Sequence, residues 1–214
     1  MIKYSCWSLL VVLLFISNGD LNAQNVTGIK ISGHFTNDLA LTNTYNFGDS
    51  LVLTGINPNR EYSVGVWTRW TADQFLLQAE LLLTNTQEKY DLGFPMSNNA
   101  IRTIADERFF VELPILIGWN INPVNIYGGA APRFATNQPT NLANWFSYGR
   151  VQTDFTLKYI VGVGLNLGSL KLDFRYNNRI LEYEDVVFIN EQSFKTVDHL
   201  ERFTVSMLID LFRQ

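Results

Sequence analysis

Apolar and polar residues alternate along most of the chain with a period of two, which is typical of β-strands. The longest such stretch is "FFVELPILIGWNI", Phe109 to Ile121, in which every odd-numbered residue is apolar. The other side of this stretch carries Glu112 near its middle. The pattern therefore predicts one long strand with an unbroken apolar side and a charge on the opposite side.

The same alternation predicts eight strands, at 28–36, 61–70, 74–86, 107–121, 124–136, 153–167, 169–181 and 201–212. Tight turns such as "TAD", "NP" and "GS" connect some of them. Long polar segments connect the others, at 37–60, 87–106, 137–152 and 182–200. Short turns that alternate with long loops are typical of an up-and-down barrel. The predicted fold is all-β: an eight-stranded antiparallel up-and-down β-barrel.

The two sides of the strands indicate which solvent each side meets. In "SLKLDFRYN", residues 169–177, apolar side chains alternate with Lys171, Asp173, Arg175 and Asn177. Charges at mid-strand are costly against lipid but are accommodated inside a barrel. The apolar sides are therefore predicted to face lipid and the charged sides to face the lumen of a transmembrane barrel. A soluble lipocalin-like calyx, with its apolar sides inward, is the alternative.

Aromatic residues lie near the ends of several predicted strands, where they suit the two interfacial girdles of a membrane protein. They are Tyr62, Trp70, Trp119, Phe134, Phe155 and Tyr176.

Composition agrees with a membrane location. Charged residues make up 17% of the chain, whereas a soluble domain contains about 25%. The net charge of −4 argues against a nucleic-acid partner, which would require a basic patch.

The first 23 residues have the layout of a secretory signal peptide. Lys3 precedes an apolar run from Leu9 to Ile16, and a polar stretch ends at Ala23. A membrane anchor helix is the alternative, but the run has about half the ~20 residues that a spanning helix needs. We expect residues 1–23 to be cleaved and residues 24–214 to form one barrel domain in a bacterial outer membrane. The mature chain would then contain no cysteine, because Cys6 lies in the signal.

Three segments resemble a Bacteroidetes family of outer-membrane β-barrels called PorT-like. They are "FFVELPILIGWNI" with its Glu112-Leu113-Pro114 element, "NIYGGAAPRF", and "YIVGVGLNLGSLKLDFRYN". The resemblance spans the mature chain and implies a small barrel of the OmpA or OmpX type. It implies little about function. The namesake member serves type IX protein secretion, a role that we do not transfer to this chain.

Six charged residues are predicted to face the lumen and to pair across it as a structural network. They are Glu80, Glu112, Arg133, Lys158, Asp173 and Arg175. Unpaired charges in so narrow an interior would each cost several kcal/mol. We expect this network to fill the barrel, which makes Glu112 a structural residue rather than a catalytic acid.

Catalytic and metal sites have weaker support in the sequence. A Ser-His-acid site would need a hydroxyl and a carboxylate around His34 or His199, and no motif fixes that geometry. The acidic segment 182–200 suits a solvated loop better than a cation site. Gly128, Gly129, Gly162 and Gly164 lie within predicted strands and form no nucleotide motif. No catalytic residue, metal or cofactor is predicted.

The function that follows is that of a non-enzymatic integral outer-membrane barrel. It would act as a structural, binding or accessory subunit of an envelope complex. Its expected partners are outer-membrane lipid and other envelope proteins that contact its external loops. A small integral outer-membrane enzyme or a narrow pore is the alternative. A wide channel is disfavoured, because side chains fill an eight-stranded barrel.

Overall fold

The protein is described by a computed structural model, which covers residues 24–36, 44–46, 52–94, 100–136, 148–151, 155–180, 184–189, 192–197 and 202–214. The predicted signal peptide and His199 lie outside these ranges. Within them the chain is all-β, and no helix is long and apolar enough to cross a membrane. The strands are β1 (Gln24–Thr36), β2 (Thr44–Asn46), β3 (Val52–Ala72), β4 (Phe75–Phe94), β5 (Ala100–Glu112), β6 (Ile115–Ile121), β7 (Val124–Ala135), β8 (Tyr148–Val151), β9 (Phe155–Leu167), β10 (Leu170–Arg179), β11 (Glu184–Ile189), β12 (Gln192–Val197) and β13 (Arg202–Arg213).

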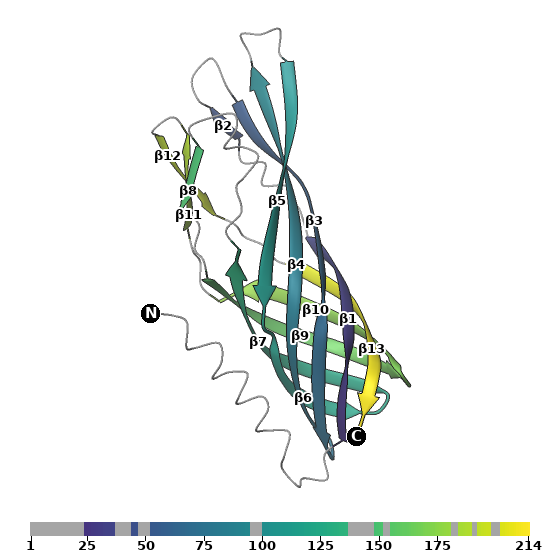
Figure 1. Cartoon of the computed structure of the whole chain (residues 1–214). Helices are drawn as coiled ribbons and strands as arrows, with labels where there is room; N and C mark the ends of the chain where they lie inside the picture. The colour runs from purple at the N-terminus through teal and green to yellow at the C-terminus, as the bar shows by residue number, and fades with distance from the viewer. Residues whose placement is uncertain are drawn as a thin grey trace.

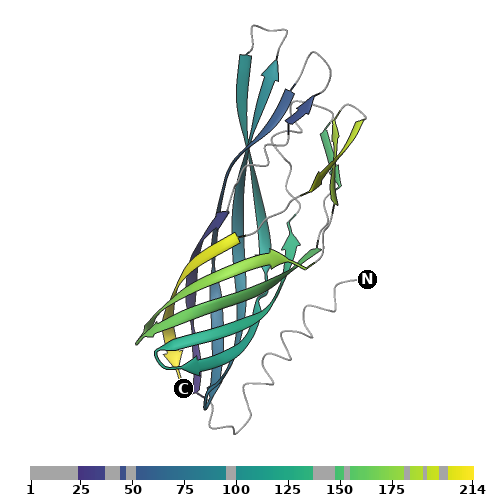
Figure 2. The same ribbon diagram turned by 180° about the vertical axis from the view of Figure 1, so that it is seen from behind.

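Eight antiparallel strands close into one barrel (Figures 1 and 2). The order around it is β1, β3, β4, β5 continued by β6, β7, β9, β10 and β13, and β13 pairs again with β1. Each strand thus pairs with the barrel strands that precede and follow it in the chain. This confirms the predicted eight-stranded antiparallel up-and-down barrel.

The strand predicted over 107–121 is interrupted at Leu113 and Pro114, which separate β5 from β6. Proline has no backbone N–H to donate to a neighbouring strand. The surrounding hydrogen bonds still hold this segment in the wall, because the Pro114 carbonyl accepts from Glu80 N at 2.9 Å and Leu113 N donates to the Pro132 carbonyl at 3.0 Å. β5 and β6 therefore occupy one place in the barrel between β4 and β7.

The tight turns lie together at one end of the barrel, which we call the turn end. They are centred on Asp73–Gln74, Asn122–Pro123 and Gly168–Ser169. Gly168 has a φ of 78°, a left-handed conformation that glycine adopts at no steric cost. The first and last strands of the barrel, β1 and β13, also meet at this end. There Asn25 and Gln214 exchange two backbone hydrogen bonds of 3.0 and 2.9 Å.

At the opposite end, three strands are longer than the sequence predicted. β3, β4 and β5 continue through residues predicted as loops, 52–60, 87–94 and 100–106, and extend beyond the barrel wall (Figure 1). The register of β3 on β4 shifts between Ile56 and Arg60. This irregularity takes up Asn57-Pro58-Asn59, so a segment with the composition of a loop runs within a strand.

The segments predicted as polar loops also contain short strands. β2 pairs with the end of β3. β8, β11 and β12 form a separate three-stranded sheet. The prediction of loops in these places was wrong, because runs of three to six residues do not show a clear period in the sequence.

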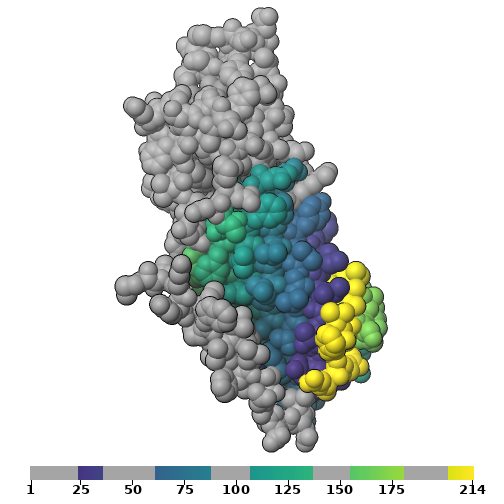
Figure 3. All heavy atoms as spheres, in the orientation of Figure 1, coloured from purple at the N-terminus to yellow at the C-terminus, as the bar shows by residue number. Residues whose placement is uncertain are grey.

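Side chains alternate between the outside and the inside of the barrel, in the predicted phase. Burial along β10 alternates regularly, with Lys171, Asp173, Arg175 and Asn177 buried and their neighbours more exposed. On the face shown in Figure 3, the atoms of neighbouring barrel strands lie side by side. Among the large apolar residues exposed on the outside are Ile31, Val64, Leu81, Ile117, Val163, Phe174 and Val205. This arrangement is opposite to that of a calyx with an apolar interior.

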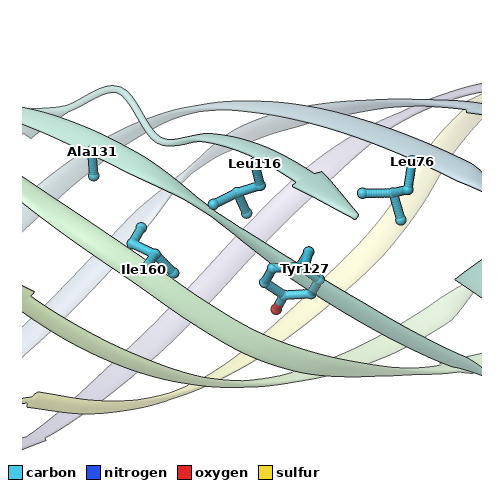
Figure 4. Packing of buried hydrophobic residues seen from close by; sticks show 5 residues of the cluster. All are labelled: Leu76, Leu116, Tyr127, Ala131 and Ile160. Carbon is cyan, nitrogen blue, oxygen red and sulfur yellow. The ribbon is translucent and has the colours of Figure 1, made fainter. Parts of the chain in front are cut away.

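Most of the buried apolar residues in the described ranges, Leu82 and Phe110 excepted, form two small groups on the inner wall. Leu76, Leu116, Tyr127, Ala131 and Ile160 make up the first (Figure 4), and Val26, Trp67 and Leu208 make up the second. These groups are small because charged and polar side chains occupy most of the interior.

Candidate functional site: the charged interior

All six predicted lumen residues are buried. Glu80, Glu112, Arg133, Lys158, Asp173 and Arg175 are each at most 6% exposed. They come from β4, β5, β7, β9 and β10, and the structure brings them together in two clusters at different depths.

The turn-side cluster consists of Lys30, Arg69, Glu80, Asp173 and Arg175. Arg175 donates to both carboxylate oxygens of Glu80, at 2.9 and 2.6 Å. It also donates to Asp173 at 2.7 Å, and Lys30 donates to Glu80 at 2.9 Å. Arg69 joins the group through Gln78, which accepts from Arg69 Nε at 2.7 Å and donates to Glu80.

The loop-side cluster consists of Glu61, Glu112, Arg133, Lys158 and Arg202. Glu112 contacts Lys158 at 2.9 Å and Arg133 at 3.2 Å. Glu61 contacts Arg133 at 3.5 Å and forms an ion pair with Arg202. Each carboxylate in this cluster therefore faces two cationic side chains.

Aromatic side chains fill the space beside the clusters. The Arg133 guanidinium lies 3.5 Å from the Phe110 ring centroid. Arg175 Nε donates to the Tyr127 hydroxyl at 3.1 Å. Towards the turn end, Lys171 pairs with Asp210 and lies 5.0 Å from the Trp67 ring centroid. Cations over aromatic faces gain further electrostatic attraction.

One strand glycine makes room for this packing. A Cβ added to Gly162 would lie 2.7 Å from Cε2 of Tyr127, so a larger residue would displace the ring. Gly162 thus allows the close packing of a large neighbour inside a barrel.

Paired charges explain how so polar an interior is stable. Moving one ion out of water costs several kcal/mol, which is offset only by close opposite charges and further hydrogen bonds. The ion pairs here link strands that are far apart in the sequence, so they hold the barrel wall together across its lumen. The arrangement is that of an ionic core.

His34 is surrounded by hydroxyl and carboxylate groups. Its Nε2 lies 2.8 Å from Ser63 Oγ, and its Nδ1 lies 2.8 Å from Thr204 Oγ1 and 3.8 Å from a Glu61 oxygen. These are the residue types of a nucleophilic Ser-His-acid site.

The space around His34 is too small for a substrate. Ser63 is 3% exposed and Glu61 is 1% exposed. The cavity that His34 lines, within the described residues, measures about 10 Å³, which is room for about one water molecule. The geometry supports a buried hydrogen-bond network around His34.

Four members of the two clusters were not among the six predicted lumen residues: Lys30, Glu61, Arg69 and Arg202. A signal for Lys30 and Glu61 was present in the sequence. Lys30 stands between the apolar residues Ile29 and Ile31, and Glu61 begins an alternation in which Tyr62 and Val64 are the apolar positions. Glu61 was overlooked because it stands at the edge of a predicted loop.

No group of three or more His, Cys, Asp or Glu side chains that could hold a metal ion occurs in the described part of the chain. The backbone of the acidic segment 182–200 includes β11 and β12. Its side chains lie outside the described part, so the expectation that it holds no cation remains a prediction.

The Glu112-Leu113-Pro114 element, which carries the resemblance to the PorT-like family, lies where β5 ends and β6 begins. Glu112 belongs to the loop-side cluster, and Pro114 interrupts the strand that carries it. In comparisons with known proteins, no protein-family model and no curated protein matches this chain. The resemblance therefore rests on the sequence motifs alone.

Proposed function

We propose that the chain is an integral barrel of a bacterial outer membrane, exported by a signal peptide over residues 1–23. In this proposal the turn end faces the periplasm and the long connections face the outside. The observation that carries it is the distribution of polarity: large apolar side chains cover the outside, and the charges are inside. Water as the outer solvent would favour the reverse.

The height of the apolar belt supports this proposal. Apolar residues occupy every second position from Phe75 to Leu83, from Tyr159 to Leu167 and from Phe203 to Leu211. At ~3.4 Å per residue these stretches are about 27 Å long. Tilted by ~40°, they would cover about 21 Å along the membrane normal, close to the ~25 Å band of outer-membrane barrels.

Aromatic residues at both edges of the belt also support it. Towards the loops, Tyr176 contacts Tyr159 and Phe203, with ring centroids 6.1 and 5.4 Å apart. Towards the turns, Trp119 is 62% exposed. Tyrosine and tryptophan are enriched at the two interfaces of a membrane.

Within this proposal the barrel is a non-enzymatic structural, binding or accessory subunit of the envelope, related to the PorT-like family. The ionic core supports this role, because a filled interior provides neither a substrate pocket nor a wide pore. Binding would then occur at the external connections, through contacts with other envelope proteins.

The experiment is fractionation of cells that express the full chain. We expect the protein in outer membranes, resistant to carbonate extraction, with different gel mobility before and after boiling. The absence of cysteine after residue 23 allows single-cysteine variants for topology: Asn141→Cys should react with an impermeant thiol reagent on intact cells, and Gln74→Cys should not. A soluble periplasmic protein without a heat-dependent shift would disprove the proposal.

A further inference from the structure

A small cavity separates the two charge clusters inside the barrel. It measures about 10 Å³, which is room for one water-sized particle. Among the side chains that line it are Lys30, Ser32, His34, Glu112, Lys158 and Arg175. The cavity therefore has contacts with both the turn-side and the loop-side cluster.

The charges around this cavity are predominantly positive. Three cationic side chains line it, Lys30, Lys158 and Arg175, against one carboxylate, Glu112. That carboxylate already faces two cations, since it contacts Arg133 as well as Lys158. The turn-side cluster likewise contains three cations, Lys30, Arg69 and Arg175, against Glu80 and Asp173. A negative occupant would reduce the cost of burying this excess.

Hydrogen-bond donors are available at the cavity wall. An ammonium group has three N–H donors. Lys30 and Lys158 each form one hydrogen bond to a carboxylate in the described residues, at 2.9 Å in both cases. The Ser32 hydroxyl is buried, with the residue 2% exposed, and has no hydrogen-bond partner in the same ranges.

We propose that this cavity is a binding site for a small monovalent anion of halide size, chloride being the physiological one. Lys30, Lys158 and Ser32 would donate to the ion, and Arg175 would add positive charge. A cation would be repelled by the three basic side chains, and a polyatomic anion would exceed the space. The ion would connect the two clusters and complete the ionic core. This inference concerns the barrel interior and is independent of the membrane location.

The experiment measures thermal unfolding of the refolded full barrel in detergent, at constant ionic strength, in sodium chloride, sodium bromide or sodium gluconate. An ion that binds only the folded state raises the melting temperature with saturation. We expect this rise with chloride and bromide. Gluconate is too large for the cavity and should give none. Equal melting temperatures in all three salts would overturn the proposal and leave a water molecule as the occupant.

Two substitutions and a matched control locate the ion. Ser32→Ala should weaken the apparent halide affinity about tenfold, the effect of losing one hydrogen bond to an ion. Lys158→Met should abolish the halide effect. Ser206→Ala is the control, because Ser206 is opposite Ser32 in the sheet and equally buried but does not line the cavity, and it should leave the effect intact.

Bromide in crystals provides a direct measurement that does not depend on the folding of the variants. Its anomalous signal should appear between Lys30 and Lys158. Signal only at the protein surface, or a halide effect unchanged in Ser32→Ala, would disprove this site.

Discussion

Arg175 and Glu80 form a two-bond ion pair across the full width of the barrel. Its bonds measure 2.9 and 2.6 Å and join residues 95 positions apart in the sequence. β10 and β4, which carry these residues, are four strands apart in a barrel of eight, so they face each other directly. Two-bond contacts between guanidinium and carboxylate are the strongest charged hydrogen bonds in proteins. The pair fastens opposite walls of the barrel.

The first prediction concerns the coupling of this pair. Arg175→Met should lower the free energy of unfolding by about 3–5 kcal/mol, because it leaves Glu80 and Asp173 short of positive charge. The double variant Glu80→Gln/Arg175→Met should lose less than the sum of the two single losses, by about 0.5–3 kcal/mol. Urea unfolding from lipid vesicles measures all three values. Additive losses would show that the two side chains do not interact in the folded protein.

The second prediction concerns Glu112 in the loop-side cluster. Glu112→Ala should lower the free energy of unfolding by about 3–5 kcal/mol, since Lys158 and Arg133 lose their shared carboxylate. Glu107→Ala on the same strand is the matched control: Glu107 is exposed, and the loss there should stay below about 0.5 kcal/mol. A stable Glu112→Ala barrel that had lost a hydrolytic activity would instead identify Glu112 as catalytic.

The third prediction compares two strand glycines. Gly162→Ala should lower the free energy of unfolding by about 1–3 kcal/mol through overpacking, because its Cβ would meet the Tyr127 ring at 2.7 Å. A Cβ added to Gly128 would point outward, and the nearest atom, the Ile160 carbonyl oxygen, would be 3.4 Å from it. Gly128→Ala should therefore be close to neutral in stability. The measurement is again urea unfolding. Equal losses at both positions would contradict the packing of Tyr127 against Gly162.

The fourth prediction tests whether the apolar belt faces lipid, as proposed, by comparing two depths along one strand. Val163 and Leu167 lie on the same side of β9 and are 47% and 52% exposed. Val163→Arg is near the middle of the belt and should cost about 2–4 kcal/mol in vesicles, whereas Leu167→Arg at its edge should cost about 0–1 kcal/mol. Folding yield and urea unfolding measure the difference. If both substitutions were tolerated equally, β9 would not contact the lipid core.

The fold was predictable because each side chain of the barrel wall points either to the apolar outer surface or to the charged interior. Alternation with a period of two therefore appears in the sequence wherever the wall is formed, as in β9 and β10. The extension of β3 was missed because the alternation is lost where the strand leaves the barrel wall. Asn57-Pro58-Asn59 lie in the part of the strand beyond the barrel wall, and their composition is that of a turn.

The sequence was sufficient to predict which charged residues point into the barrel, but not which of them pair with each other. The phase of each strand indicates that Glu80 and Arg175 point inward. Their contact depends on the tilt of the strands and the stagger of the register around the barrel, which a single sequence does not contain. The surroundings of His34 could not be predicted for that reason, although Ser63 and Glu61 share its side of the wall.

The last prediction concerns ion conduction. The turn-side and loop-side clusters fill the lumen at two depths, with Trp67 buried near the turn end at 1% exposure. A side-chain core of this kind leaves no continuous aqueous path through the described part of the barrel. We therefore expect little or no steady conductance when the purified barrel is inserted in planar bilayers. Removing the large side chains at two depths, in Trp67→Gly/Arg175→Gly, should produce measurable channel openings if the variant inserts, which its heat-dependent gel mobility would establish. Large open-channel currents from the wild type would contradict the filled interior and favour the narrow-pore alternative.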